Sequence, residues 1–161
     1  MSGDRAADCS AQLCTFRIGR LLLGVDIMKV QEVLLPQEMT RVPLASRAVG
    51  GLINLRGQIA TAIDLRWQLG LQPRSTDDRP MNVVVRTEDG AVSLLVDRIG
   101  DIVAVRDSAF EDPPATIAPP IKRLIHGVYK LEHQLLLFLD VDRAARVALD
   151  PSTPATSHPH R

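Results

Sequence analysis

Aromatic residues are scarce in this chain: of its 161 residues, one is Trp, one is Tyr and three are Phe. Proteins that bind single-stranded nucleic acids stack the bases on aromatic side chains, so this composition argues against a stacking platform. The formal net charge is zero, which also argues against the basic surface that binds a phosphate backbone. We therefore expect no nucleic-acid partner.

Cysteine is almost absent. The two residues present, Cys9 and Cys14, lie close to the N-terminus without a second Cys or His pair nearby. A structural zinc site needs four ligands, and the four His residues are not spaced as a metal-binding set. We expect two free thiols, no metal site and no cofactor.

Long apolar runs are absent too, so no segment is long enough to span a bilayer. The polar start of the chain, residues 1–8, has no signal-peptide core. These features predict a cytoplasmic protein without direct membrane insertion. Hydrophobic residues make up 45% of the chain, which is enough for a sizeable core. We expect a mobile N-terminal tail over residues 1–12, a folded domain over 13–149 and a disordered C-terminal tail over 150–161.

Catalytic motifs are missing. No Gly-rich phosphate loop and no Gly-x-Ser-x-Gly elbow occurs. Asp64 and Asp97 each follow an apolar run, and paired carboxylates can perform acid–base chemistry. Neither residue has a nucleophile or a His beside it, so we expect turn capping, or pairing with Arg66 or Arg98, and no catalytic residue.

Short apolar runs separated by turn residues predict an all-β protein. Gly19-Arg20 and Asp89-Gly90 each join two such runs and predict hairpins. No internal repeat is apparent. The expected strands are Leu13–Ile18, Leu21–Ile27, Met28–Leu35, Leu52–Leu55, Ile59–Leu65, Asn82–Arg86, Val92–Val96, Ile99–Val105, Leu124–Lys130 and Leu135–Asp140.

Helices are expected to be few. Residues 141–149 form an amphipathic pattern, and Asp140 or Asp142 is placed to cap or complement its N-terminus. One or two helical turns are expected over 65–71, and a short helix over 45–49. The Pro-rich residues 110–120 are expected to be irregular. The strands divide naturally into two five-stranded barrels, one built from the strands before Pro36 plus a late strand, the other from residues 55–105.

The run Asn54-Leu55-Arg56-Gly57 lies between two apolar segments. Asn and Gly tolerate positive φ and favour a tight bend. Arg56 is then displayed to a partner, or it caps the turn or pairs with a local carboxylate such as Asp64. The residues alone favour neither interpretation.

Glu32 is a charge within an otherwise apolar strand. It marks either the face of a binding groove or a solvated position on a half-exposed strand, and the pattern alone favours the second.

Several blocks together resemble the CheW-type coupling proteins of bacterial chemotaxis. The resemblance covers residues 13–149. Its blocks are Phe16-Arg17-Ile18, Leu23 to Val33, Val42-Pro43, Val49-Gly50-Gly51, Asn54-Leu55-Arg56-Gly57, Ile63-Asp64-Leu65-Arg66 and Leu94 to Ile99.

The resemblance implies two five-stranded, SH3-like barrel subdomains around a shared hydrophobic core. It also implies a non-enzymatic adaptor that links the cytoplasmic tip of methyl-accepting chemoreceptors to the regulatory domain of a CheA-type histidine kinase. Contacts with other CheW-like domains could build rings, because the kinase domain resembles the adaptor itself.

Residue by residue, the resemblance implies three kinds of site position. Arg56, Glu32 and Val30 match receptor-contact positions, and Gly51 and Asn54 match positions that shape the same segment. Further groove-lining positions are Met81, Ile99 and Ile102.

Two residues depart from the family pattern: Thr61 stands where proline is common and Ser93 where glycine is common. Both fall in expected strands, so the fold should survive. The departures leave open a CheW-like paralogue that serves a pathway for motility, biofilm or development. A small hydrolase built on Asp64 and Asp97 and a small-ligand-binding β-barrel are the competing interpretations.

Overall fold

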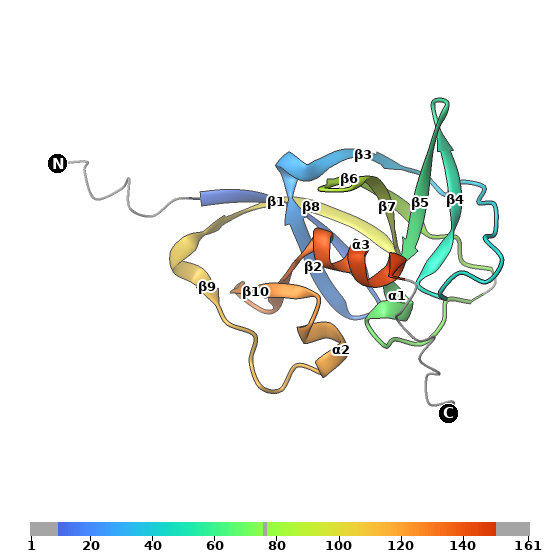
Figure 1. Ribbon diagram of the computed structural model, residues 1–161. Helices are drawn as coiled ribbons and strands as arrows, with labels where there is room; N and C mark the ends of the chain where they lie inside the picture. The colour runs from blue at the N-terminus through green and yellow to red at the C-terminus, as the bar shows by residue number, and fades with distance from the viewer. Residues whose placement is uncertain (1–9, 76, 151–161) are drawn as a thin grey trace.

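The computed structural model describes residues 10–75 and 77–150 and is mostly β, with short helices (Figure 1). The strands are β1 (Ser10–Ile18), β2 (Leu21–Asp26), β3 (Val30–Leu34), β4 (Val49–Leu55), β5 (Gln58–Asp64), β6 (Met81–Thr87), β7 (Gly90–Val96), β8 (Arg98–Arg106), β9 (Phe110–Glu111), β10 (Ile125–Lys130) and β11 (Leu135–Leu139). The helices are η2 (Ile27–Lys29), α1 (Leu65–Gln68), η3 (Asp107–Ala109), α2 (Pro119–Lys122) and α3 (Val141–Leu149).

The strands form two sheets, which confirms the all-β fold with two subdomains. The first sheet has the order β8-β1-β2-β11-β10-β9, and the second has the order β3-β6-β7-β5-β4. Within the described residues, no ladder closes either sheet into a full barrel. The expected division of strands was wrong. β3, which precedes Pro36, pairs with β6 in the second sheet, and the first sheet has six strands, of which four are late strands, β8 to β11, instead of one.

The two predicted hairpins are confirmed. β1 and β2 pair across Gly19-Arg20, and β6 and β7 pair across Glu88-Asp89. A break after β2 was not predicted: the Asp26 carboxylate accepts a hydrogen bond from the Met28 N–H at 2.9 Å. This bond caps the 3-10 turn η2, so β3 begins at Val30 instead of Met28.

An internal repeat that the sequence hides is visible in the strand registers. Residues 13–34 correspond to residues 82–103, and residues 48–65 correspond to residues 124–141. Equivalent residues of the two segments have equivalent strand partners. The β4–β5 hairpin of the first repeat is equivalent to the β10–β11 hairpin of the second. Each has a bulge that ends at a glycine, Gly51 or Gly127. Each of the two hairpins is followed by a helix that an aspartate caps, Asp64 for α1 and Asp140 for α3. The third strand of each repeat pairs with the first strand of the other repeat: β3 pairs with β6, and β8 pairs with β1.

One hydrophobic core lies between the two sheets. It contains Phe16 and Leu23 from the first sheet and Val83 and Leu94 from the second, all fully buried. Ala144 of α3 packs into the same cluster. The shared core that the resemblance implies is therefore present.

Three local expectations were wrong. Residues 45–49 form no helix, because the Ser46 hydroxyl accepts the Ala48 N–H at 3.1 Å and holds a turn before β4. The Pro-rich stretch contains β9, which pairs with β10, and α2, which begins at Pro119 because proline is tolerated at a first helical position.

The N-terminal tail was predicted to extend to residue 12, but β1 begins at Ser10 and pairs with β8 from that residue onward. The remaining tail segments and Cys9 lie outside the described residues. Within residues 10–75 and 77–150, no helix combines the length and apolar character needed to cross a membrane.

Ser93 and Asn82 form a polar pair inside the second sheet. Both are almost fully buried, and the Ser93 hydroxyl donates to the side-chain amide oxygen Oδ1 of Asn82 at 2.8 Å. We expect Ser93→Ala to lower the free energy of unfolding by about 1–3 kcal/mol, because the buried Asn82 oxygen loses its donor. Urea unfolding of the variant measures this.

The double variant Asn82→Leu/Ser93→Ala removes both polar groups and should recover part of the loss. An unchanged free energy of unfolding in Ser93→Ala would contradict this role of the pair.

Candidate functional site

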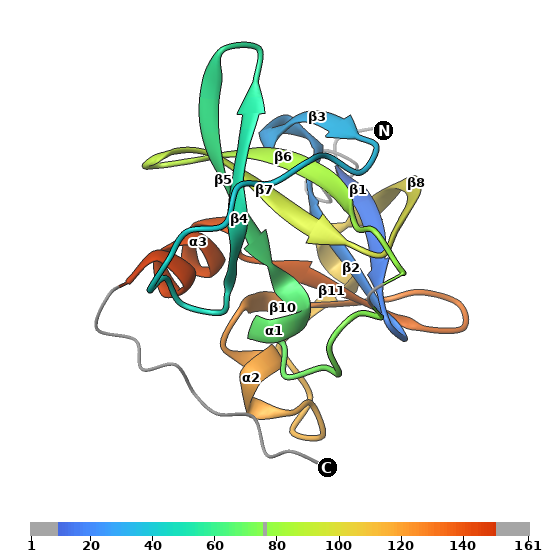
Figure 2. The ribbon, with the colours of Figure 1, turned by 90° about the vertical axis from the view of Figure 1, so that its right-hand side faces the viewer.

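The β4–β5 hairpin stands out from the body of the protein in both views (Figures 1 and 2). Its two-residue turn consists of Arg56 with φ +53° and Gly57 with φ +89°. Positive φ at both positions is the geometry of a type I′ turn, which fits the twist of a hairpin. The side-chain amide oxygen Oδ1 of Asn54 accepts the Gly57 N–H at 2.9 Å. The prediction that Asn54 shapes the bend is confirmed.

Arg56 and Glu32, which were singled out separately in the sequence, are ion-paired. The Arg56 Nη2–Glu32 Oε1 distance is 3.2 Å. Because β3 and β4 are the opposite edges of the second sheet, this contact joins one edge strand to the tip of the hairpin at the other edge. The carboxylate that Arg56 pairs with is thus Glu32 and not Asp64. The Glu32 side chain is 19% exposed, so it is not a freely solvated residue.

The Arg56 side chain is 85% exposed, although its carboxylate partner is largely covered. An exposed ion pair contributes only about 0.2–1 kcal/mol to stability. Holding a residue other than glycine in the left-handed region costs roughly 1–2 kcal/mol. The pair therefore does not offset the strain at Arg56 by a clear margin. Backbone strain at an exposed charged residue indicates a functional position.

Gly51 allows another segment to approach the hairpin. Its φ is +152°, and a Cβ here would lie 2.9 Å from the Thr40 carbonyl oxygen. Thr40 and Leu52 exchange two backbone hydrogen bonds at this point. The approach leaves a hollow of about 700 Å³ between residues 37–40 and the hairpin, lined partly by Ile59, which is 65% exposed.

The remaining positions implied by the resemblance lie on β3, β6 and β8. Val30, Met81 and Ile99 are partly buried and pack against the shared core. Ile102 on β8 is 56% exposed. Val30 and Ile99 occupy equivalent places in the internal repeat, since Val30 pairs with Val85 and Ile99 with Phe16.

Asp64 and Asp97 are structural, as expected. Asp64 caps α1 by accepting the Trp67 N–H at 3.4 Å. Asp97 accepts the Gly19 N–H at 2.7 Å and is ion-paired with Arg66 at 3.2 Å and Arg74 at 2.9 Å. The pairing with Arg66 is confirmed. Arg74 was missed, because it lies in a polar connection whose sequence gives no sign that it folds back onto β7.

The surroundings of the two carboxyls shift their pKa values in opposite directions. Burial raises the pKa of Asp64, and the nearby Arg74 and the α1 N–H groups only partly oppose this. Burial would also raise the pKa of Asp97, but the Gly19 N–H and the Arg74 and Arg66 guanidinium groups outweigh it and hold that pKa below its ordinary value. These carboxyls serve packing and charge pairing, and no nucleophile accompanies them. The described residues contain no cluster of three or more His, Cys, Asp or Glu side chains able to hold a metal ion.

A family model described as "CheW-like domain" matches residues 12–148. The chain belongs to this family. It is 32% identical over 136 residues to the chemotaxis protein CheW of Treponema pallidum, covering 82% of this chain and 80% of that protein. It is 26% identical over 148 residues to the chemotaxis protein CheW of Bacillus subtilis, covering 92% of each.

A crystal structure of the scaffolding protein TtCheW from Thermoanaerobacter tengcongensis has the same fold. The TM-score is 0.78 at 22% sequence identity, and the match covers 90% of this chain and 97% of that one. Protein PilI of Pseudomonas aeruginosa is also similar, at 26% identity over 123 residues, covering 76% of this CheW-like chain and 69% of that protein.

Arg56→Asn separates the turn's stability from its exposed charge. Asn-Gly is a preferred type I′ sequence, so we expect the variant to keep its free energy of unfolding within about 1 kcal/mol of the parent despite losing the ion pair. Chemical denaturation measures this. A loss well above that range would show that Arg56 is required for folding.

Asp97→Asn tests the charge cluster through its pH dependence. A carboxyl whose pKa is lowered by folding stabilises the fold fully at any pH above its pKa in the unfolded chain. This stabilisation is lost as the pH falls through its pKa in the folded protein. We therefore expect the variant to be less stable than the parent at pH 7, with the difference shrinking below about pH 4. Thermal unfolding across this range measures it, with the exposed Asp112→Asn as a control that shows no such trend. A difference independent of pH would contradict the assignment.

Proposed function

We propose that this protein is a non-enzymatic adaptor that couples chemoreceptors to a CheA-type histidine kinase. Family membership supports this, since its relatives include chemotaxis proteins and a scaffolding protein. The observation that carries the proposal is the Glu32–Arg56 pair, which places a strained, exposed arginine at the tip of a projecting hairpin. The protein then acts in the cytoplasm and reaches membrane receptor arrays through its partners.

The surface around this pair has the chemistry to hold a helical partner. The hollow beside the hairpin offers exposed apolar side chains: Met39 is 37% exposed and Ile59 is 65% exposed. An amphipathic helix can bury its apolar face on such side chains. Arg56 then fixes orientation by pairing with an acidic group of the partner. In this proposal the receptor tip contacts Val30, Glu32, Asn54 and Arg56, and Gly51 fixes the position of the hairpin.

A second surface is needed for the kinase regulatory domain. Met81, Ile99 and Ile102 are the remaining candidate groove positions, and Ile102 presents apolar surface on the edge strand β8. Contacts of the same kind between CheW-like domains would extend the assembly into rings. Single contacts can then be weak, because linked binding events raise the overall avidity.

A second candidate function is adaptor work in a chemosensory pathway for motility, biofilm or development. The similarity to PilI, a relative whose name is not that of a chemotaxis protein, supports it. The buried Ser93–Asn82 pair, at a position where glycine is common in the family, is a departure that affects packing within the second sheet.

Calorimetric titration against a soluble fragment of the receptor tip and against the kinase regulatory domain tests the proposal. We expect Arg56→Asn to weaken receptor-tip binding at least about tenfold, since a charge-assisted contact is lost. Kinase binding should be unchanged.

Arg106→Asn provides a matched control, because it removes the same charge from an exposed strand position on β8. If both variants weaken receptor-tip binding equally, the effect of Arg56→Asn comes from the overall charge and not from a specific contact. An absence of receptor and kinase binding in the parent protein would overturn the adaptor proposal.

A further inference from the structure

A second charged feature lies at the far side of the β1–β2 hairpin, where its turn meets the start of β8 and the segment after α1. These parts enclose a pocket of about 500 Å³. Five arginines and two aspartates line it: Arg17, Arg66, Arg74, Arg79, Arg98, Asp78 and Asp97. The whole chain has no net charge, so this excess of arginine is local.

Two of these arginines already share a carboxylate partner. Arg66 and Arg74 both donate to the Asp97 carboxylate, at 3.2 and 2.9 Å. The Gly19 N–H occupies a further acceptor position on the same carboxylate. Asp97 therefore has little capacity left for the other arginines of the pocket.

The other three arginines lack a carboxylate partner within the described part of the chain. Arg17 donates to the neutral Gln134 amide oxygen at 2.9 Å, and Arg79 and Arg98 are exposed without an ion pair there. Arg17 and Arg98 are also direct cross-strand partners in the β1–β8 ladder. Like charges at such a position destabilise a sheet, so an anion between the two guanidinium groups would reduce their repulsion.

The internal repeat supplies a comparison within the same molecule. By register, Arg17 corresponds to Arg86 and Arg98 to Lys29. At that second location each cation has an acceptor: Arg86 donates to the Met28 carbonyl at 2.6 Å, and Lys29 is ion-paired with Asp142 at 3.0 Å.

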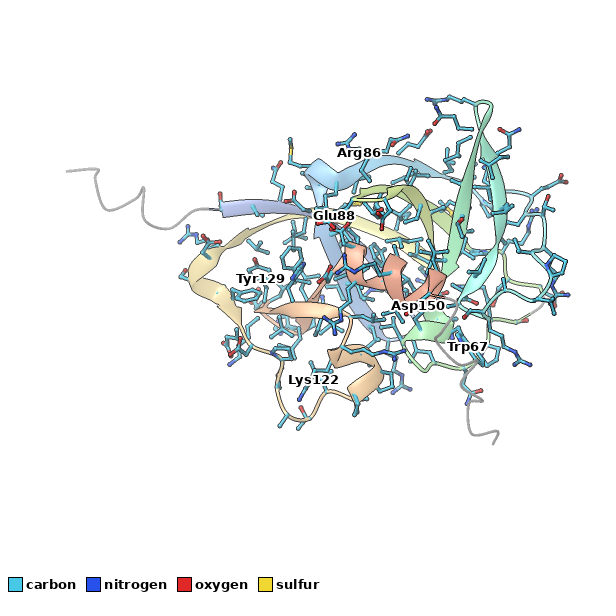
Figure 3. All side chains as sticks on the ribbon, in the orientation of Figure 1. Trp67, Arg86, Glu88, Lys122, Tyr129 and Asp150 are labelled. Carbon is cyan, nitrogen blue, oxygen red and sulfur yellow. The ribbon has the colours of Figure 1, made fainter. Side chains whose placement is uncertain are left out.

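The second location includes a further balanced pair. Arg146 is ion-paired with Glu88 at 3.6 Å, and Glu88 and Arg86 are both labelled in Figure 3. Two of the three cations here thus have a carboxylate partner, and Arg86 has a neutral acceptor. The equivalent hairpin end therefore folds with a smaller positive surplus, so the larger surplus at the Arg17–Arg98 location is not a requirement of the fold.

We propose that this pocket binds a small anion that carries two or more phosphate groups. Arginine suits phosphate because its planar fork donates two parallel hydrogen bonds. The pocket's volume is in the range typical of small-molecule sites. Arg17, Arg79 and Arg98 would hold the anion, while Asp97 keeps Arg66 and Arg74 in place beneath it. The inference is independent of the adaptor function.

The test is calorimetric titration of the full chain with tripolyphosphate at constant ionic strength. We expect one binding site, and at least about tenfold weaker binding in Arg79→Ala/Arg98→Ala. The control Arg106→Ala/Arg123→Ala removes the same charge from exposed positions outside the pocket and should change the affinity less than about twofold. Thermal unfolding confirms that both variants are folded.

Four outcomes would overturn the inference. Absence of binding, or equal weakening in both double variants, would leave no specific site. Citrate binding as tightly as tripolyphosphate would exclude a phosphate preference. Binding of an acidic peptide that depends on Arg79 and Arg98, without binding of tripolyphosphate, would assign the surface to a protein partner.

Discussion

Each sheet of this protein is built from strands of both halves of the chain. β3 leaves the first hairpin to pair with β6, and β8 leaves the second hairpin to pair with β1. Neither sheet can complete its pairing without both repeats, and both pack on the same core. The exchange also determines where charges meet, because β3 carries Glu32 across to the sheet whose far edge bears the Arg56 hairpin.

The repeat distinguishes structural residues from residues free to take on a function. Asp64 and Asp140 cap the helices in both repeats, and Gly51 and Gly127 occupy both bulges, so these positions follow from the fold. The hairpin tips differ: Arg56-Gly57 in the first repeat corresponds to Glu132-His133 in the second. The arginines beside Asp97 differ from their counterparts in pairing: Arg98 has no ion pair within the described residues, whereas its counterpart Lys29 is ion-paired with Asp142. We propose that function in this CheW-like protein lies where the two repeats have diverged.

Local signals in the sequence predicted local structure well. Gly19-Arg20 and Asp89-Gly90 marked hairpins, and Asp140 marked the start of α3, because each of these effects depends on neighbouring residues. The strand exchange was not predictable from periodicity, since a strand's pattern does not identify its partner. The Glu32–Arg56 pair spans 24 residues, and Arg74 reaches Asp97 from a polar loop, so both contacts depend on tertiary structure. Among the candidate positions, Asn54 followed from turn chemistry, whereas the grouping with Glu32 required the folded chain.

In the proposed function, the Glu32–Arg56 pair displays Arg56 to a partner and does not merely hold the hairpin. The charge swap Glu32→Arg/Arg56→Glu keeps an ion pair within the protein and reverses the charge at the exposed tip. Titration of this variant with the receptor-tip fragment, alongside a denaturation curve, is the most direct test. We expect near-parental stability with receptor binding lost. Parental affinity in the swapped variant would show that the pair is structural and would contradict its role in binding.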